Sequence, residues 1–128
     1  MSLFMLDADA VSEVMRGSPI RDQHLIALDS SEWCISAITH AEICSGLAQR
    51  PEAIRIARAA AAFFEVARSL PWDASAAETD GKLRAQLQRA DTPIGDFDEM
   101  IAAHALSLSA VLVTANCVTS SASRGSTS

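Results

Sequence analysis

Acidic side chains in three separate parts of the sequence are the residues best suited to chemistry. Asp7, with Asp9 two positions later, follows a short apolar run, and Glu42 and Asp98 fall in the first turns of two expected helices. Carboxylates crowded together repel one another and raise each other's pKa unless a cation neutralises them. Hard oxygen ligands without a His or Cys cluster favour Mg²⁺, or Mn²⁺ in its place, over zinc. If the fold brings these acids together, we expect Asp7 and Asp98 to bind Mg²⁺ with Glu42 nearby, and bound water to attack a phosphodiester.

Helix capping offers a simpler explanation for several of these acids. Thr39 and Glu42 have the spacing of a capping box, and Asp96 and Glu99 repeat that spacing. Asp96 is therefore expected to cap a helix rather than bind a metal, and Asp98 could simply favour a helix N-terminus. Capping by itself leaves open whether Glu42 and Asp98 have a second role.

Short apolar runs alternate with helical segments along the chain. We expect strands at residues 3–6, 33–38, 70–72 and 110–114, and helices at residues 11–16, 20–29, 51–68, 74–90 and 96–108, with a further helix starting at residue 39. This alternation predicts an α/β fold whose mostly parallel sheet is covered on both faces, with any site at the carboxyl ends of the strands.

Helical spacing predicts which faces of these helices are buried. Asp98 shares a face with Ile101 and Ala105, which places it on the inward side, and His104 falls off that face and is expected to be peripheral. In the alanine-rich helix 51–68, the expected core face consists of four residues at helical spacing, Ile54, Ala57, Ala61 and Phe64.

The composition fits one globular domain. The chain has 128 residues, 49% of them hydrophobic, and a net charge of −6, which argues against non-specific binding to nucleic acid or to anionic membranes. Three cysteines without CxxC spacing and no signal peptide predict a cytoplasmic protein, and no apolar stretch approaches the roughly 20 residues that cross a membrane. We expect a domain over residues 1–116 and a flexible Ser/Thr-rich tail over residues 117–128.

Three blocks of sequence are similar to a known family. FMLDAD at residues 4–9, ISAITHAEI at 35–43 and PIGDFDEMIAAHA at 93–105 resemble the PIN-domain ribonuclease toxins of VapC type, and the resemblance extends in order and spacing over residues 3–116. It implies a three-layer α/β/α fold and a metal-dependent endoribonuclease, with RNA as substrate, a cognate antitoxin as partner and a homodimer as the usual assembly.

The resemblance also assigns residues to the site. Asp7, Glu42 and Asp98 correspond to the family's acidic ligands, Asn116 matches a fourth acidic or amide position, and Thr114 matches a nearby hydroxyl position. Asp9 is expected to form a turn or to support Asp7.

The sequence departs from the family at two places. Ala8 stands where the family often has a hydroxyl residue, and residues 117–128 do not match the usual aromatic-containing last strand. These departures keep open a catalytically weakened module that only binds its antitoxin or RNA.

Two further alternatives rest on short motifs. DADAV at residues 7–11 resembles the nucleophile loop of haloacid dehalogenase-like phosphatases, in which Asp7 would attack phosphorus. His40 and Cys44 have the i, i+4 spacing of a zinc pair, but no second pair accompanies them. Several basic residues on two helices, among them Arg50, Arg84 and Arg89, could flank an acidic cleft and hold RNA phosphates.

Overall fold

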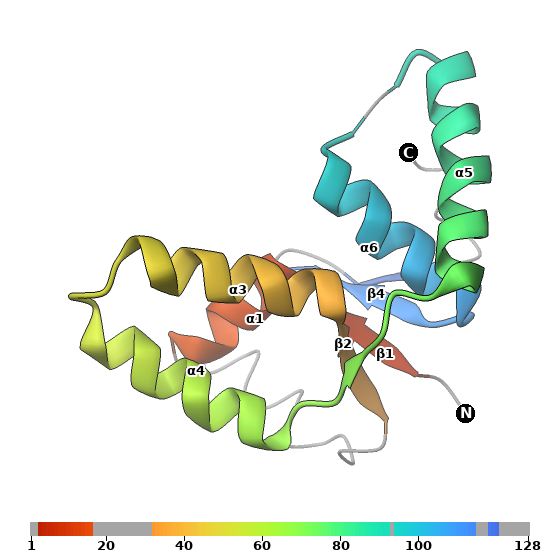
Figure 1. Ribbon diagram of the computed structural model, residues 1–128. Helices are drawn as coiled ribbons and strands as arrows, with labels where there is room; N and C mark the ends of the chain where they lie inside the picture. Colours follow the sequence, from red (N-terminus) through yellow and green to blue (C-terminus); the bar gives the residue numbers. More distant parts are fainter. Residues whose placement is uncertain (1–2, 17–31, 93, 115–117, 121–128) are drawn as a thin grey trace.

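A mostly parallel sheet lies at the centre of the computed structural model, which describes residues 3–16, 32–92, 94–114 and 118–120 (Figure 1). Its strand order is β3-β2-β1-β4-β5. The strands are β1 (Phe4–Leu6), β2 (Trp33–Ser36), β3 (Ser69–Leu70), β4 (Val111–Val113) and β5 (Val118–Ser120). All are parallel to their neighbours except β5, which is antiparallel to β4.

Helices cover both faces of this sheet (Figure 1). They are α1 (Ala8–Met15), α3 (Ala37–Gln49), α4 (Ile54–Val66), α5 (Ala74–Arg89) and α6 (Asp96–Ser107). Met5 and Leu112 join one core with α5 and α6, whereas Leu6, Ile35 and Val113 join the other with α1, α3 and α4. Because successive strand residues point to opposite faces, the strands feed two cores and the three-layer α/β/α prediction is confirmed. Within the described residues, no helix has the length and apolar character needed to cross a membrane.

The helix after β2 starts earlier than the sequence pattern predicts. Ser36 is the N-cap of α3, and its hydroxyl oxygen accepts a hydrogen bond from the Ile38 N–H at 3.1 Å. The capping box predicted for Thr39 and Glu42 is therefore wrong, because both residues already lie inside the helix. Glu42 is left without the capping role that would explain it.

The predicted cap of α6 is also wrong. Gly95 is the N-cap and makes no side-chain capping bond, while Asp96 is exposed in the first turn and Glu99 is buried. Glu99 is buried because it faces α5, so its place in the sequence reflects a tertiary contact and not a local cap.

The alanine-rich helix α4 buries a different face from the predicted one. Ala60 and Phe63 enter the core, whereas Ile54, Ala57 and Ala61 are exposed. Alanine at many positions gives the helix no single apolar stripe, so the sequence does not show whether the face of Phe63 or that of Phe64 is buried. In the structure the ring of Phe63 contacts Trp33 of β2, and this contact places the Phe63 face in the core.

The last described segment corrects part of the predicted tail. Residues 118–120 form β5 along β4, in a register that pairs Val113 with Val118. Valine and threonine favour strands, and this pairing satisfies backbone groups on the outer edge of β4. Residues 121–128 and the predicted helix at 20–29 lie outside the described residues.

Candidate active site

A cavity of about 250 Å³ opens beside the carboxyl ends of β1 and β4. The chain continues from β1 to β2 on one side and places β4 on the other, so this is where the strand order reverses, the usual ligand site of open α/β sheets. Asp7 follows β1 directly, and its N–H donates to the Val113 carbonyl at 3.0 Å. The cavity is lined by acidic, hydroxyl and apolar side chains, Asp7, Asp9, Ile94, Asp98, Ile101, Leu112 and Thr114.

Asp7 is held in an environment that disfavours its charge. Burial, followed by the nearby charges of Asp9 and Asp98, raises its pKa from 3.8 to about 6. The Ala10 N–H donates to Asp7 Oδ1 at 2.8 Å, which opposes that shift and makes Asp7 the N-cap of α1. This cap starts α1 at Ala8, three residues before the predicted helix, and it fixes one carboxylate oxygen at the edge of the cavity.

Glu42 approaches the same acids from α3. Burial raises its pKa, and the charges of Asp98, Asp7 and Asp9 add to that effect. Its Oε1 atom is buried and has no hydrogen-bond partner among the described residues. Glu42 lines a neighbouring groove of about 490 Å³ between α1, α3 and α4, at which Arg16 and Arg50 also lie. Glu42 thus lines the groove, leaves one carboxylate oxygen without a described partner, and is close enough to the acids of the cavity for their charges to affect its pKa.

Asp98 is exposed, which corrects the inward position predicted from helical spacing. Ile101, Ala102 and Ala105, on the same helical face, are buried as predicted. The first turn of α6 projects beyond the sheet, so only the later turns pack on it (Figure 1). Asp98 is consequently exposed, whereas Asp7, which lines the same cavity, is partly buried.

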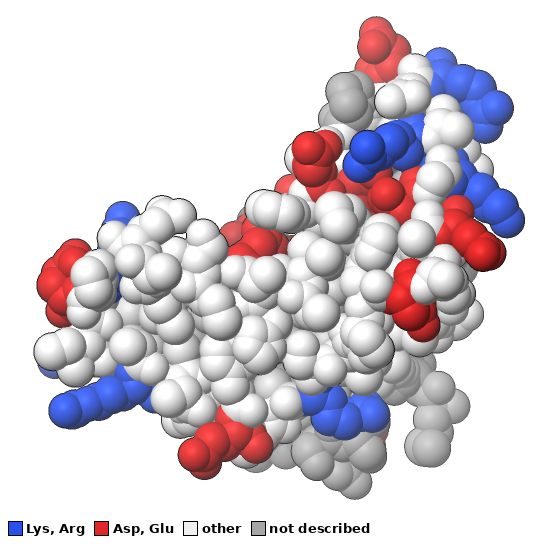
Figure 2. All heavy atoms as spheres, in the orientation of Figure 1, with Lys and Arg blue, Asp and Glu red and all other residues white. Residues whose placement is uncertain are grey.

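The acidic character of this region is visible on the surface. Figure 2 shows Asp and Glu side chains in the hollow between α3 and α6, whereas Lys and Arg gather on the outer side of α5. None of the described residues lining the cavity is basic. The carboxylates therefore face one another without a neighbouring side-chain cation inside the cavity.

The donor set fits a hard divalent cation held by few protein ligands. Among the residues that the structure describes, no three His, Cys, Asp or Glu side chains are grouped as a ready metal cage. Mg²⁺ usually binds through one or two carboxylates and keeps several waters, so Asp7 and Asp98 in one cavity meet that requirement. The unsatisfied Oε1 of Glu42 and the raised pKa of Asp7 are both features that a nearby cation would relieve.

Of the remaining predicted site residues, two lie at the cavity. Asp9 and Thr114 line the cavity, whereas Asp96 is exposed and does not. Asn116 lies outside the described residues.

Sequence reasoning missed the role of His104. It is 2% exposed, and its Nδ1 lies 2.8 Å from the Ser36 hydroxyl oxygen, so the expectation of a peripheral residue is wrong. Burial lowers its pKa, because removal from water disfavours the charged ring. The sequence does contain one indication that His104 is buried. The small alanines at 102, 103 and 105 allow neighbouring elements to pack closely on all sides of α6.

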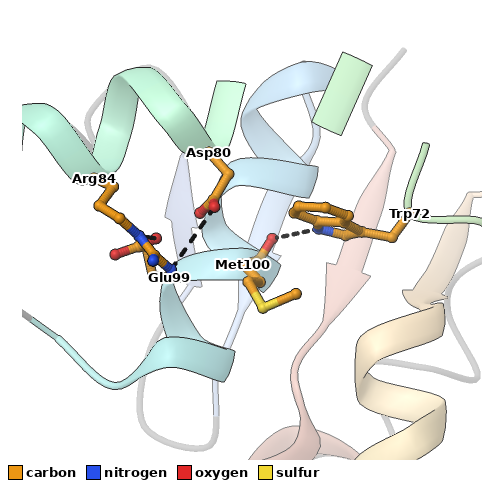
Figure 3. Close-up of polar contacts among 5 residues, drawn as sticks. All are labelled: Trp72, Asp80, Arg84, Glu99 and Met100. Carbon is orange, nitrogen blue, oxygen red and sulfur yellow. Dashed lines mark hydrogen bonds and ion pairs between the residues drawn. The ribbon is translucent and has the colours of Figure 1, made fainter. Parts of the chain in front are cut away.

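Arg84 has a partner inside the protein. Its Nε donates to Glu99 Oε2 at 2.7 Å, a contact between α5 and α6 (Figure 3). Arg84 does not line the acidic cavity, and its contact with RNA phosphates stays a prediction.

Together these features define an α/β/α domain with carboxylates gathered at its topological switch point. The chain matches the PIN domain over residues 4–118 and belongs to that family. It is 34% identical over 116 residues to a tRNA(fMet)-specific endonuclease VapC of Salmonella typhimurium strain LT2, covering 91% of this chain and 88% of that protein. It is 35% identical over 118 residues to a protein of the same name from Shigella flexneri, with the same shares of each chain covered.

A solved structure agrees with this assignment. The crystal structure of DNA-bound VapBC from Salmonella typhimurium superposes with a TM-score of 0.78 at 33% identity, over 89% of this chain and 85% of that chain. The resemblance to VapC-type PIN domains is confirmed, and nothing supports the phosphatase alternative.

Proposed function

We propose that this protein is a VapC-type toxin and that it hydrolyses RNA phosphodiester bonds with Mg²⁺, for which Mn²⁺ can substitute. The observation that carries the proposal is the cavity shared by Asp7 and Asp98, in which burial and mutual repulsion raise the pKa of Asp7 to about 6. A protein gains nothing in stability from such a group of carboxylates, so their convergence indicates a function that uses a bound cation.

Asp7 and Asp98 are the residues that would hold the metal, with Glu42 close by. A bound Mg²⁺ supplies polarisation of a phosphoryl oxygen and a lower pKa for a bound water. Glu42, whose pKa is raised and whose Oε1 is unsatisfied, is suited to accept the proton of the attacking water. Asp9 and Thr114 line the same cavity and would orient that water. Asn116 follows β4 in the sequence and is proposed as a further, neutral oxygen ligand.

The neighbouring groove offers a path for the rest of the substrate. Glu42 lines it together with Arg16 and Arg50, and both arginines are exposed. Backbone phosphates of an RNA strand could bind these arginines while the bond to be cleaved lies over the acidic cavity. This arrangement supports local RNA binding by a protein whose net charge is −6.

The partners and setting follow from the same family membership. We infer a cognate antitoxin as protein partner, because the Salmonella typhimurium structure named above is a VapBC complex. We also infer a homodimer that acts in the cytoplasm. The match over residues 4–118 supports a catalytic domain in the first 116 residues, and a flexible end after residue 120 remains a prediction.

Cleavage of labelled RNA tests the proposal. Initiator tRNA and control tRNAs would be incubated with the purified protein in Mg²⁺, in Mn²⁺ and in EDTA. We expect cleavage that requires the metal and that falls by at least about a hundredfold in Asp7→Asn and Asp98→Asn. Equal cleavage by wild type and both variants would refute the site. Metal binding without cleavage of any RNA would support the weakened binding module, which Ala8 and the unusual C-terminal sequence keep in consideration.

A further inference from the structure

The first turn of α6 is held by residues that do not line the cavity. Glu99 follows Asp98 directly and is 5% exposed, and its Oε2 accepts the Arg84 Nε–H at 2.7 Å (Figure 3). Asp80, one helical turn before Arg84 on α5, lies 3.9 Å from the same guanidinium. The ion pair thus joins α5 to the turn that carries Asp98.

A second contact reaches the next residue of α6. The indole N–H of Trp72 donates to the Met100 carbonyl at 3.0 Å, from the segment between β3 and α5 (Figure 3). The two contacts fall on consecutive residues immediately after Asp98. They come from different directions, so together they restrict both rotation and sliding of this turn.

These contacts matter because the helix does not fix its own start. Gly95 caps α6 without a side-chain bond, and the first turn projects beyond the sheet. An exposed, uncapped turn frays readily. The Asp98 carboxylate would then sample several positions at the mouth of the cavity, which weakens a metal site that depends on few protein ligands.

The two carboxylates around Arg84 indicate that this ion pair positions the first turn of α6 rather than only stabilising the protein. Glu99 is buried, and Asp80 Oδ1 is also buried without a hydrogen-bond partner among the described residues. One arginine therefore faces two carboxylates, an arrangement that an apolar contact would commonly equal or exceed in stability. What the ion pair supplies is direction, because a charged hydrogen bond fixes the angle of the turn.

We propose that Arg84, Glu99 and Trp72 are positioning residues that lock the first turn of α6 so that Asp98 faces Asp7. The inference rests on the proposed function only in giving Asp98 the role of a metal ligand. None of the three residues lines the cavity. They act on the site through the first turn of α6, which carries Asp98.

Hydrogen exchange of the metal-free protein tests the lock without reference to activity. The Glu99 N–H donates to the Gly95 carbonyl at 2.9 Å and reports on the first turn. We expect Arg84→Met and Trp72→Phe each to speed its exchange by about tenfold, the size expected for losing one hydrogen bond of about 1.4 kcal/mol. Arg89→Met removes the same charge from an exposed position on α5 and should leave this exchange unchanged. Equal exchange in wild type and in both test variants would overturn the proposal.

Metal binding tests the consequence for Asp98. In Arg84→Met, we expect the Mn²⁺ dissociation constant and the half-saturating Mg²⁺ for cleavage to rise about tenfold, the lower end of the effect of residues that orient metal ligands. The cleavage rate at saturating metal should stay within about twofold of wild type, and Arg84→Lys should restore most of the affinity. Leu87→Ala, a buried position on the same helix, is the control for general loss of stability. A similar loss of metal affinity in Leu87→Ala at a temperature where both variants are folded would overturn the positioning role.

The outcomes separate this inference from the proposed function. Weakened Mn²⁺ binding in Arg84→Met, in a protein that cleaves no RNA, would support the lock and reject the nuclease. Normal cleavage by wild type with unchanged metal dependence in Arg84→Met would reject the lock and leave the nuclease standing.

Discussion

Replacing Asp7 by Asn should stabilise the metal-free protein while destroying its metal site. Asparagine keeps the oxygen that accepts the Ala10 N–H at 2.8 Å, so α1 retains its N-cap. The change removes only the charge, which burial, Asp9 and Asp98 all disfavour. Replacing an acidic residue that caps a helix usually lowers the free energy of unfolding. For Asp7→Asn we expect the free energy of unfolding to rise.

The size and pH range of the effect follow from the pKa of Asp7. Its pKa is raised from 3.8 to about 6, so the folded protein binds a proton more tightly than the unfolded chain does. Stability is therefore lost as the pH rises from about 4 to about 6, and the full penalty applies above pH 6. Each unit of pKa shift corresponds to about 1.36 kcal/mol, so the upper limit of the destabilisation by the Asp7 charge is about 3 kcal/mol. Because Asp7 is partly exposed, we expect Asp7→Asn to raise the free energy of unfolding by about 1–2 kcal/mol.

Urea unfolding in EDTA, followed by tryptophan fluorescence, measures this difference. At pH 8, Asp7→Asn should exceed wild type in free energy of unfolding by about 1–2 kcal/mol. The difference should shrink to a small fraction of that near pH 4, where Asp7 is protonated in the folded protein and partly protonated in the unfolded chain. Asp7→Ala serves as the control because it removes both charge and cap, and the lost cap costs about 1 kcal/mol. Adding Mg²⁺ at about ten times its dissociation constant should stabilise wild type by about 1.4 kcal/mol and leave Asp7→Asn unchanged.

One result would refute this reasoning directly. If Asp7→Asn is no more stable than wild type at pH 8 in EDTA, and the difference does not change between pH 4 and pH 8, the carboxylates do not repel as the cavity implies. The case for a cation at this site would then lose its main physical support.

Three further predictions concern buried side chains of the fold. Phe63→Ala should cost about 3–5 kcal/mol in urea unfolding, because its ring is buried; a cost below about 1 kcal/mol would contradict that packing. Ser36→Ala should lower the free energy of unfolding by about 2–3 kcal/mol, since it removes the α3 cap and leaves the buried Nδ1 of His104 unpaired. An unchanged NMR signal of the His104 ring in this variant would contradict the Ser36–His104 contact. Cys34, whose pKa burial raises to about 11, should resist alkylation that modifies exposed Cys44; peptide mass spectrometry would show equal modification if this is wrong.

The sheet and its acidic edge could be predicted from sequence because both depend on local signals. Short apolar runs ended by polar residues located β1 and β4, and a parallel α/β order placed Asp7 and Thr114 at adjacent strand ends. Strand pairing and the switch point follow from topology rules that need no side-chain detail.

Exposure on α6 could not be predicted in the same way. Helical spacing gives the direction of a residue around the axis, but not how far each turn extends past the sheet. Asp98 shares its direction with buried Ile101, yet stands exposed because the first turn projects outward. His104 lies off that face, yet is buried because α6 packs on its other sides as well.

The two glutamates at predicted capping positions show why local rules fail near a functional site. Glu42 and Glu99 each stand three residues after a residue that could cap a helix, and neither belongs to a cap. A local rule assigns each acid the nearest backbone N–H, whereas the fold gives Glu99 an arginine from another helix and leaves Glu42 Oε1 with no described partner. Both departures cost stability, and each glutamate is a neighbour of Asp98: Glu99 follows it in the sequence, and the charge of Asp98 contributes to the raised pKa of Glu42. Ser36 caps α3, and Gly95 starts α6 without a side-chain cap, so neither glutamate stands where it does in order to cap a helix; what the two share is their nearness to Asp98, at the acidic cavity.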